Sequence, residues 1–131
     1  MRLWHEKLLP YLPRQQLLGQ HRECCALRGK GWGRNHSVVN YVFKHPHEWL
    51  YQYHMRVMAE MERRGYRPDP SWKDGKYRGT SCPPLEEFND SLAIVGTPVY
   101  PEHNAEYLEE CLQNLESKGI NLREQVKPSN Q

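Results

Sequence analysis

The sequence contains no apolar run approaching the roughly 20 residues that a membrane-spanning helix requires. Residues 1–7 also lack the continuous apolar segment of a secretion signal. None of the four cysteines forms a CxxC pair, and Cys24 and Cys25 are neighbours. Neither a disulfide framework nor a complete set of four zinc ligands is therefore predicted. We expect a cytoplasmic protein with reduced thiols and with no metal or cofactor.

Acidic residues are scarce in the first part of the chain. Residues 1–80 contain 15 Lys and Arg against 7 Asp and Glu, whereas residues 81–131 contain 3 against 9. The overall net charge of +2 conceals this asymmetry, and six of the seven histidines also lie in the first part. The distribution indicates a nucleic-acid-binding face built mainly from the N-terminal part of the chain. A dipolar surface without a partner would have the same composition.

Three segments show the apolar periodicity of amphipathic helices, and a glycine follows closely after each of them. These segments cover residues 13–28, 46–64 and 103–117. The proline-rich stretch between the second and the third is predicted to be mainly loop, with a short helix over residues 85–89 as a possibility. The sequence therefore predicts an all-α fold, a compact single domain of three main helices with long loops.

The two ends of the chain differ in character. The first 12 residues carry several large apolar side chains, including Leu3 and Trp4, which is unusual because termini generally fray. We expect this N-terminal segment to thread into the core. Residues 121–131 are polar and are predicted to form a mobile tail, so that residues 1–120 make up the single helical domain.

Glu23 lies on the face of the first predicted helix that is opposite the apolar arc. Gly19, four residues earlier, and Ala26, three residues later, leave free space around its carboxylate. This spacing is compatible with a ligand that approaches Glu23 closely. It is equally compatible with an ordinary solvated glutamate.

The first predicted helix is followed by a glycine-rich basic loop, Gly-Lys-Gly-Trp-Gly-Arg-Asn-His over residues 29–36. The spacing of a phosphate-binding P-loop is absent from it. Such loops can lie along a nucleic-acid backbone, and we expect Arg28, Lys30, Arg34 and His36 to contact backbone phosphates there. Each of these charges could instead be an ordinary solvated side chain.

Several motifs, taken in their order along the chain, resemble the pyrimidine-dimer DNA glycosylase family, which includes the dimer-specific endonuclease V of phage. An apolar N-terminus precedes a helix that contains Leu-Leu-Gly-Gln-His-Arg-Glu, and the basic loop leads to Asn35-His36. The long second helix then ends in Arg63-Arg64-Gly65-Tyr66, and Tyr77-Arg78-Gly79 follows. The resemblance covers residues 1 to about 80.

This resemblance implies a DNA repair enzyme that is both a glycosylase and an apurinic/apyrimidinic lyase. The N-terminal amine, here of Met1, attacks the sugar C1′ of a damaged nucleotide of the pyrimidine-dimer type. The base leaves, and β-elimination from the resulting Schiff base nicks the strand. The resemblance further implies that Glu23 is the catalytic carboxylate, that Arg2 and Arg22 bind phosphates, and that the partner is damaged double-stranded DNA. We expect the protein to act as a monomer.

A terminal amine suits this chemistry because its reference pKa, about 7.7 to 8.0, lies well below the value of about 10.4 for lysine. Two other interpretations stay open. Members of the family usually carry the amine on threonine, so a chain that begins with Met1 could be a non-catalytic nucleic-acid-binding module of the same fold. A metal-dependent hydrolase that uses His45, His47, His54 and a carboxylate is the third hypothesis.

Overall fold

The computed structural model describes residues 2–126, whose regular elements are all helices, with no strand among them. The three main helices are α1 (Arg14–Arg28), α2 (His47–Arg63) and α3 (Ala105–Glu116), and a short helix α4 (Arg123–Val126) follows them. Three short 3-10 helices lie between these elements: η1 (Glu6–Leu8), η2 (Asn40–Lys44) and η3 (Pro70–Lys73). The prediction of an all-α domain with three main helices is confirmed.

Helix α1 begins directly after Pro13 and ends at Gly29, within one residue of the predicted bounds. The Gly29 N–H donates to the carbonyl groups of Cys25 and Ala26. A Cβ atom at Gly29 would lie only 2.9 Å from the carbonyl oxygen of Arg78. The helix therefore ends where a distant segment of the chain approaches so closely that only glycine fits.

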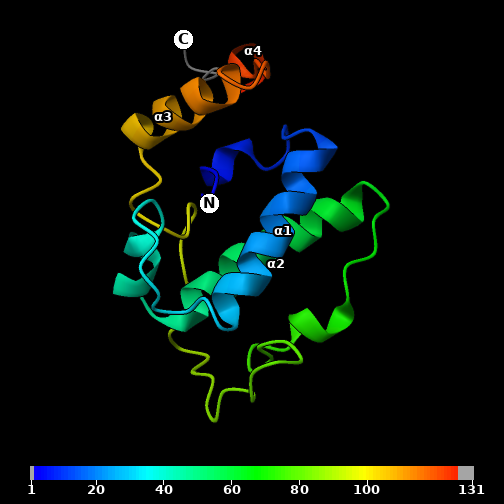
Figure 1. The fold of residues 1–131 in the computed structure, drawn as a ribbon, viewed down its shortest axis with the longest axis vertical. Helices are drawn as coiled ribbons and strands as arrows, with labels where there is room; N and C mark the ends of the chain where they lie inside the picture. Colours follow the sequence, from blue (N-terminus) through cyan, green and yellow to red (C-terminus); the bar gives the residue numbers. More distant parts are fainter. Residues whose placement is uncertain (1, 127–131) are drawn as a thin grey trace.

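Helix α2 crosses α1 at the centre of the molecule and packs against it (Figure 1). It begins after Pro46 and is followed by Gly65 with a φ of +89°, a left-handed conformation that favours glycine. Its buried face carries Leu50, Tyr53 and Val57. The sequence therefore predicted both ends of α2 to within one residue.

Helix α3 begins two residues later than expected, because Asn104 caps it. The Asn104 side chain accepts a hydrogen bond from the Tyr107 N–H at 2.9 Å. His103, which was assigned to the helix, precedes this cap and is buried. Its Nδ1 accepts from the Glu6 N–H, and its Nε2 lies 2.6 Å from the Tyr41 hydroxyl.

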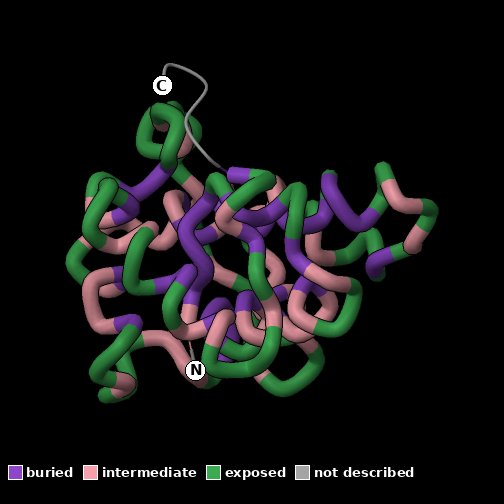
Figure 2. The backbone as a smooth tube through the Cα atoms, turned by 90° about the horizontal axis from the view of Figure 1, so that it is seen from above, coloured by how far each residue is buried: buried purple, intermediate pink, exposed green. Residues whose placement is uncertain are grey.

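The N-terminal segment runs between α1 and α3 (Figure 1), and its side chains are buried. Leu3 and Leu8 have no exposed surface, and Trp4 is 7% exposed. The expectation that this segment threads into the core is confirmed. Figure 2 shows buried stretches of backbone through the middle of the molecule and exposed stretches around its edge.

Two expectations about less regular segments were wrong. Residues 85–89 form no helix. Residues 121–126 are not a mobile tail, because Leu122 and Val126 pack into the hydrophobic core and Arg123 pairs with two carboxylates of α3. A polar segment folds here because two well-spaced apolar side chains are enough to anchor it. The remainder of the expected tail, residues 127–131, lies outside the described residues.

All four cysteines are unpaired, as expected. Between residues 2 and 126, no helix combines the length and the apolar composition needed to cross a bilayer.

Candidate active site

A buried glutamine of α1 fixes the backbone at the start of the chain. Gln20 is 2% exposed, and its side-chain oxygen accepts a hydrogen bond from the Trp4 N–H at 2.6 Å. Its side-chain nitrogen donates to the carbonyl oxygen of Arg2 at 3.0 Å. One side chain thus satisfies backbone groups on both sides of Leu3, which ties the segment to α1.

Two tyrosines complete this attachment from the other main helices. The Tyr53 hydroxyl of α2 donates to the Trp4 carbonyl oxygen at 2.6 Å. The Tyr107 hydroxyl of α3 donates to the Leu3 carbonyl oxygen at 2.5 Å. The backbone of residues 2–4 is therefore held by side chains of α1, α2 and α3.

A pocket of about 480 Å³ opens beside this segment, and its size is in the usual range for small-ligand sites. Its wall combines the N-terminal segment, one face of α1, the loop after α1, and the end of α3. The predicted residues Arg2, Arg22 and Glu23 all line it. The complete lining is Arg2, Trp4, Gln16, Gly19, Gln20, Arg22, Glu23, Val38, Asn114 and Lys118.

Glu23 is the one acidic residue in this lining, which also includes the cations Arg2, Arg22 and Lys118. Partial burial raises the pKa of the Glu23 carboxyl above its usual range, while the His36 ring and the Arg2 backbone act in the opposite direction. Gly19 lies in the pocket wall one turn before Glu23, so no side chain shields the carboxylate on that side. The spacing noted in the sequence therefore corresponds to an open approach to Glu23.

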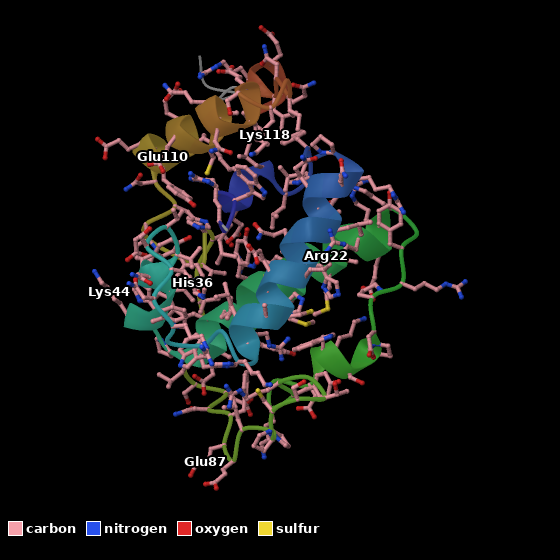
Figure 3. All side chains as sticks on the ribbon, viewed as in Figure 1. Arg22, His36, Lys44, Glu87, Glu110 and Lys118 are labelled. Atoms are coloured by element: carbon pink, nitrogen blue, oxygen red, sulfur yellow. The ribbon has the colours of Figure 1, made fainter. Side chains whose placement is uncertain are left out.

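The two predicted phosphate-binding arginines of the pocket differ in their surroundings. Arg2 is 16% exposed, and its guanidinium pairs with Glu110 of α3 at 3.1 Å. The same guanidinium lies over the Trp4 and Tyr107 rings. Arg22 is exposed on α1 (Figure 3), so its guanidinium is the more accessible of the two.

The loop after α1 carries three of the other predicted DNA contacts. Lys30 and Arg34 are exposed, and Arg34 Nε donates to the Lys30 carbonyl oxygen at 2.8 Å. His36 is half-buried and close enough to Glu23 for its charge to lower the pKa of that carboxyl (Figure 3). None of these three residues lines the pocket.

Arg28 is not at the surface, and the prediction that it contacts DNA phosphates was wrong. Its side chain has no exposed area, and hydrogen-bond acceptors of the protein surround its guanidinium. Its guanidinium donates to the carbonyl oxygens of Trp72, Asp74 and Tyr77, at 2.8, 2.9 and 3.3 Å. Arg28 therefore binds the loop over residues 72–77 to the end of α1, because its donors meet backbone acceptors there instead of solvent.

Met1 lies outside the described residues, so its predicted catalytic role stays a prediction. The residues that directly follow Met1 are described, and Gln20 and the two tyrosines hold them beside the pocket.

The three histidines of the hydrolase hypothesis do not gather into one site within residues 2–126. His45 pairs with Glu102 at 3.0 Å, and the His47 ring packs on Trp32. His54 instead lies beside two residues of α1, His21 and Cys25. This cluster was not predicted, although the spacing of four between His21 and Cys25 was visible in the sequence.

Residues 1–74 match the sequence profile of a family described as pyrimidine dimer DNA glycosylase. The chain belongs to this family. The match includes the N-terminal segment, α1, the basic loop and α2, and so covers most of the pocket wall. No curated protein and no solved structure matches the chain.

The remaining wall of the pocket comes from beyond the region that matches the family. Asn114 of α3 and Lys118 of the following turn line the pocket together with residues of α1. Figure 3 labels Lys118 close to the end of α3. Neither residue was predicted, because about 90 residues separate them from Glu23 and no spacing pattern links the two segments. Lys118 adds a third cation to the lining.

Proposed function

We propose that this protein is a bifunctional DNA glycosylase and apurinic/apyrimidinic lyase that acts on pyrimidine-dimer-type damage in double-stranded DNA. Membership of the family gives the DNA glycosylase class. One observation supports the proposed mechanism above the others: the carboxylate of Glu23 lies half-buried in a pocket whose wall includes Arg2, next to the chain's first residue. We expect a monomeric, cytoplasmic enzyme.

The proposed reaction begins with the neutral amine of Met1. Its nitrogen forms a bond to C1′ of the damaged nucleotide as the glycosidic bond breaks, and the base leaves with the electron pair of that bond and takes up a proton. The sugar ring opens to a Schiff base between C1′ and the amine. Loss of a proton from C2′ then expels the 3′ phosphate, which breaks the strand.

Glu23 has two tasks in this scheme. As a carboxylate it stabilises the positive charge that develops on the sugar as the base departs. It also moves protons during ring opening and elimination, and its raised pKa is suited to a group that both accepts and returns a proton. The damaged nucleotide must be displaced toward the pocket, which costs least at a damaged pair.

The cations around the pocket suit a phosphate backbone. Arg22 of α1 and Lys118 after α3 both line the pocket, and the loop after α1 carries the further basic residues Lys30, Arg34 and His36. Arg2 serves as a phosphate contact while it stays paired with Glu110. These contacts give salt-dependent affinity without base recognition.

Trapping with borohydride tests the proposal, because it reduces a Schiff base to a stable amine. We expect the untagged protein to form a covalent adduct with duplex DNA that contains an abasic site or a pyrimidine dimer. A peptide fused before Met1 removes the amine and should abolish the adduct. Glu23→Gln should slow strand cleavage by a factor of about 100 or more.

Glu87→Gln is the matched control, since Glu87 is an exposed glutamate at the end of the molecule distant from the pocket (Figure 3). It should leave trapping and cleavage unchanged. Salt-dependent DNA binding without any adduct would instead support the non-catalytic binding module. An adduct that survives the N-terminal fusion would refute the assignment of the amine.

A further inference from the structure

A second cluster of reactive side chains lies outside the pocket, where α1 and α2 cross. His21 and Cys25 are one turn apart on α1, and His54 faces them from α2. His21 Nδ1 lies 2.8 Å from His54 Nε2, and the Cys25 Sγ lies 4.0 Å from each of these nitrogens. None of the three residues lines the pocket that contains Glu23.

We propose that His21, Cys25 and His54 bind one divalent metal ion of the zinc type, which links α1 to α2. Bond lengths of about 2.0 to 2.3 Å place the ligand atoms of a tetrahedral zinc ion roughly 3.3 to 3.6 Å apart. The three atoms here are separated by 2.8 to 4.0 Å, so small side-chain rotations bring all of them to bonding distance. Two imidazoles and a thiolate are the donors that zinc prefers.

The burial of the cluster fits a site of this kind. His54 has no exposed surface, whereas His21 and Cys25 are partly exposed. An ion can therefore enter from solvent, and water can occupy a fourth position. Two main helices carry the three ligands, and rigid elements of this kind hold metal ligands in place.

Metal binding requires a change in the hydrogen bond between Arg28 and His54. Its Nη1 lies 2.9 Å from His54 Nδ1, and because a guanidinium can only donate, the neutral His54 ring carries its proton on Nε2. That proton points at His21 Nδ1. When the ion binds Nε2, this proton moves to Nδ1, the Cys25 thiol releases its proton to solvent, and Arg28 gives up its bond to the ring.

The remaining charges around the cluster have opposite signs. Asp69 contributes a negative charge that acts on both His21 and Cys25 and favours a cation. The positive charges of Arg22 and Arg28 oppose it. Arg28 keeps its three backbone carbonyl acceptors when it releases His54, so that its own charge stays solvated by the protein.

The proposal is tested by zinc titration of the untagged protein, followed by calorimetry and by native mass spectrometry. We expect one equivalent of zinc with a dissociation constant below about 10 μM. Cys25→Ser and His21→Gln should each weaken binding at least about tenfold. Cys82→Ser is the matched control, since Cys82 is also partly exposed but lies outside the cluster, and it should bind zinc like the unmodified protein.

Cobalt supplies a second measurement that reports on the ligands directly. The cobalt-loaded protein should show the near-ultraviolet charge-transfer band of a thiolate ligand, and Cys25→Ser should lack it. Absence of zinc binding by the unmodified protein, or equal binding by Cys25→Ser, would overturn the proposal. Neither measurement involves DNA cleavage, so the outcome is independent of the proposed enzymatic function.

Discussion

The charged form of the Glu23 side chain is less stable in the folded protein than in water, because the side chain is half-buried. A pKa raised by folding favours the protonated form of the folded state. This favourable contribution to the free energy of unfolding is fully present below the pKa that Glu23 has in the unfolded chain. It is lost as the pH rises through the pKa that Glu23 has in the folded protein. At neutral pH the ionised Glu23 therefore lowers the free energy of unfolding.

We accordingly expect Glu23→Gln to raise the midpoint of thermal unfolding at pH 7 while it removes cleavage activity. Near about pH 3 the carboxyl is protonated in both states, so the difference between variant and unmodified protein should vanish. Scanning calorimetry at the two pH values measures this. A lower midpoint for the variant at pH 7 would contradict the description of Glu23 as a carboxylate that partial burial destabilises.

His103 makes the opposite kind of contribution, because burial lowers its pKa to about 3. The folded protein resists protonation of this ring, whereas the unfolded chain takes up a proton below about pH 6.5. The contribution of the neutral ring to the free energy of unfolding is thus fully present above about pH 6.5. It is lost as the pH falls toward the pKa of the ring in the folded protein.

We expect His103→Gln to reduce the acid sensitivity of the protein. Between about pH 6.5 and 4.5, the variant should lose about 2 kcal/mol less of its unfolding free energy than the unmodified protein. Urea titrations at both pH values give this difference. Equal losses in the two proteins would show that His103 is not kept neutral by the fold.

At the scale of the elements, α1 carries the pocket on one face and the core on another. Its interior glycine, Gly19, costs helix stability, because alanine is favoured in helices by about 1 kcal/mol. A Cβ atom there would meet only the Arg22 side chain, at 3.7 Å, which is an ordinary contact. The position is therefore one where a methyl group fits the fold but enters the pocket.

Gly19→Ala should stabilise the protein by about 0.5 to 1 kcal/mol and should also weaken trapping of damaged DNA. Chemical denaturation and the yield of the borohydride adduct measure the two effects on the same preparation. If the variant were more stable and trapped DNA as well as the unmodified protein, the pocket wall at Gly19 would not contact the substrate.

The sequence predicted the long helices well because proline and glycine mark their ends. Pro13, Gly29, Pro46 and Gly65 set the limits of α1 and α2 through local backbone chemistry. Helix α4 and the 3-10 helices were missed because they are too short to show a period, and packing decides them. The burial of Arg28 was missed for a related reason: its acceptors are carbonyl groups more than 40 residues away.

Prediction of the site from the sequence also failed for residues that are distant in sequence. Arg2, Arg22 and Glu23 were found because they match the pattern of the family, and all three line the pocket. Asn114, Lys118 and the partner of His21 and Cys25 come from other parts of the chain, and only the fold brings them to these sites.

At the scale of the whole molecule, the charge of the N-terminal part predicts how DNA binding depends on salt. If Lys30 and Arg34 each contact one phosphate, replacing either by alanine should weaken binding and reduce the slope of log affinity against log salt by about 1. Fluorescence anisotropy over a range of salt concentrations gives this slope.

Arg123→Ala is the matched control for this measurement, because Glu109 and Glu116 already neutralise the Arg123 guanidinium. It should leave the slope unchanged. Unchanged slopes for the Lys30 and Arg34 variants as well would place the DNA elsewhere on the molecule.

The attachment of the N-terminal segment also bears on biosynthesis. Arg2 pairs with Glu110, the Leu3 carbonyl accepts from Tyr107, and the Glu6 N–H donates to His103. During synthesis the N-terminal segment therefore lacks these partners until about 100 further residues have been made. A nascent chain that still lacks α3 cannot close the pocket, so the candidate site is completed only after α3 has been synthesised.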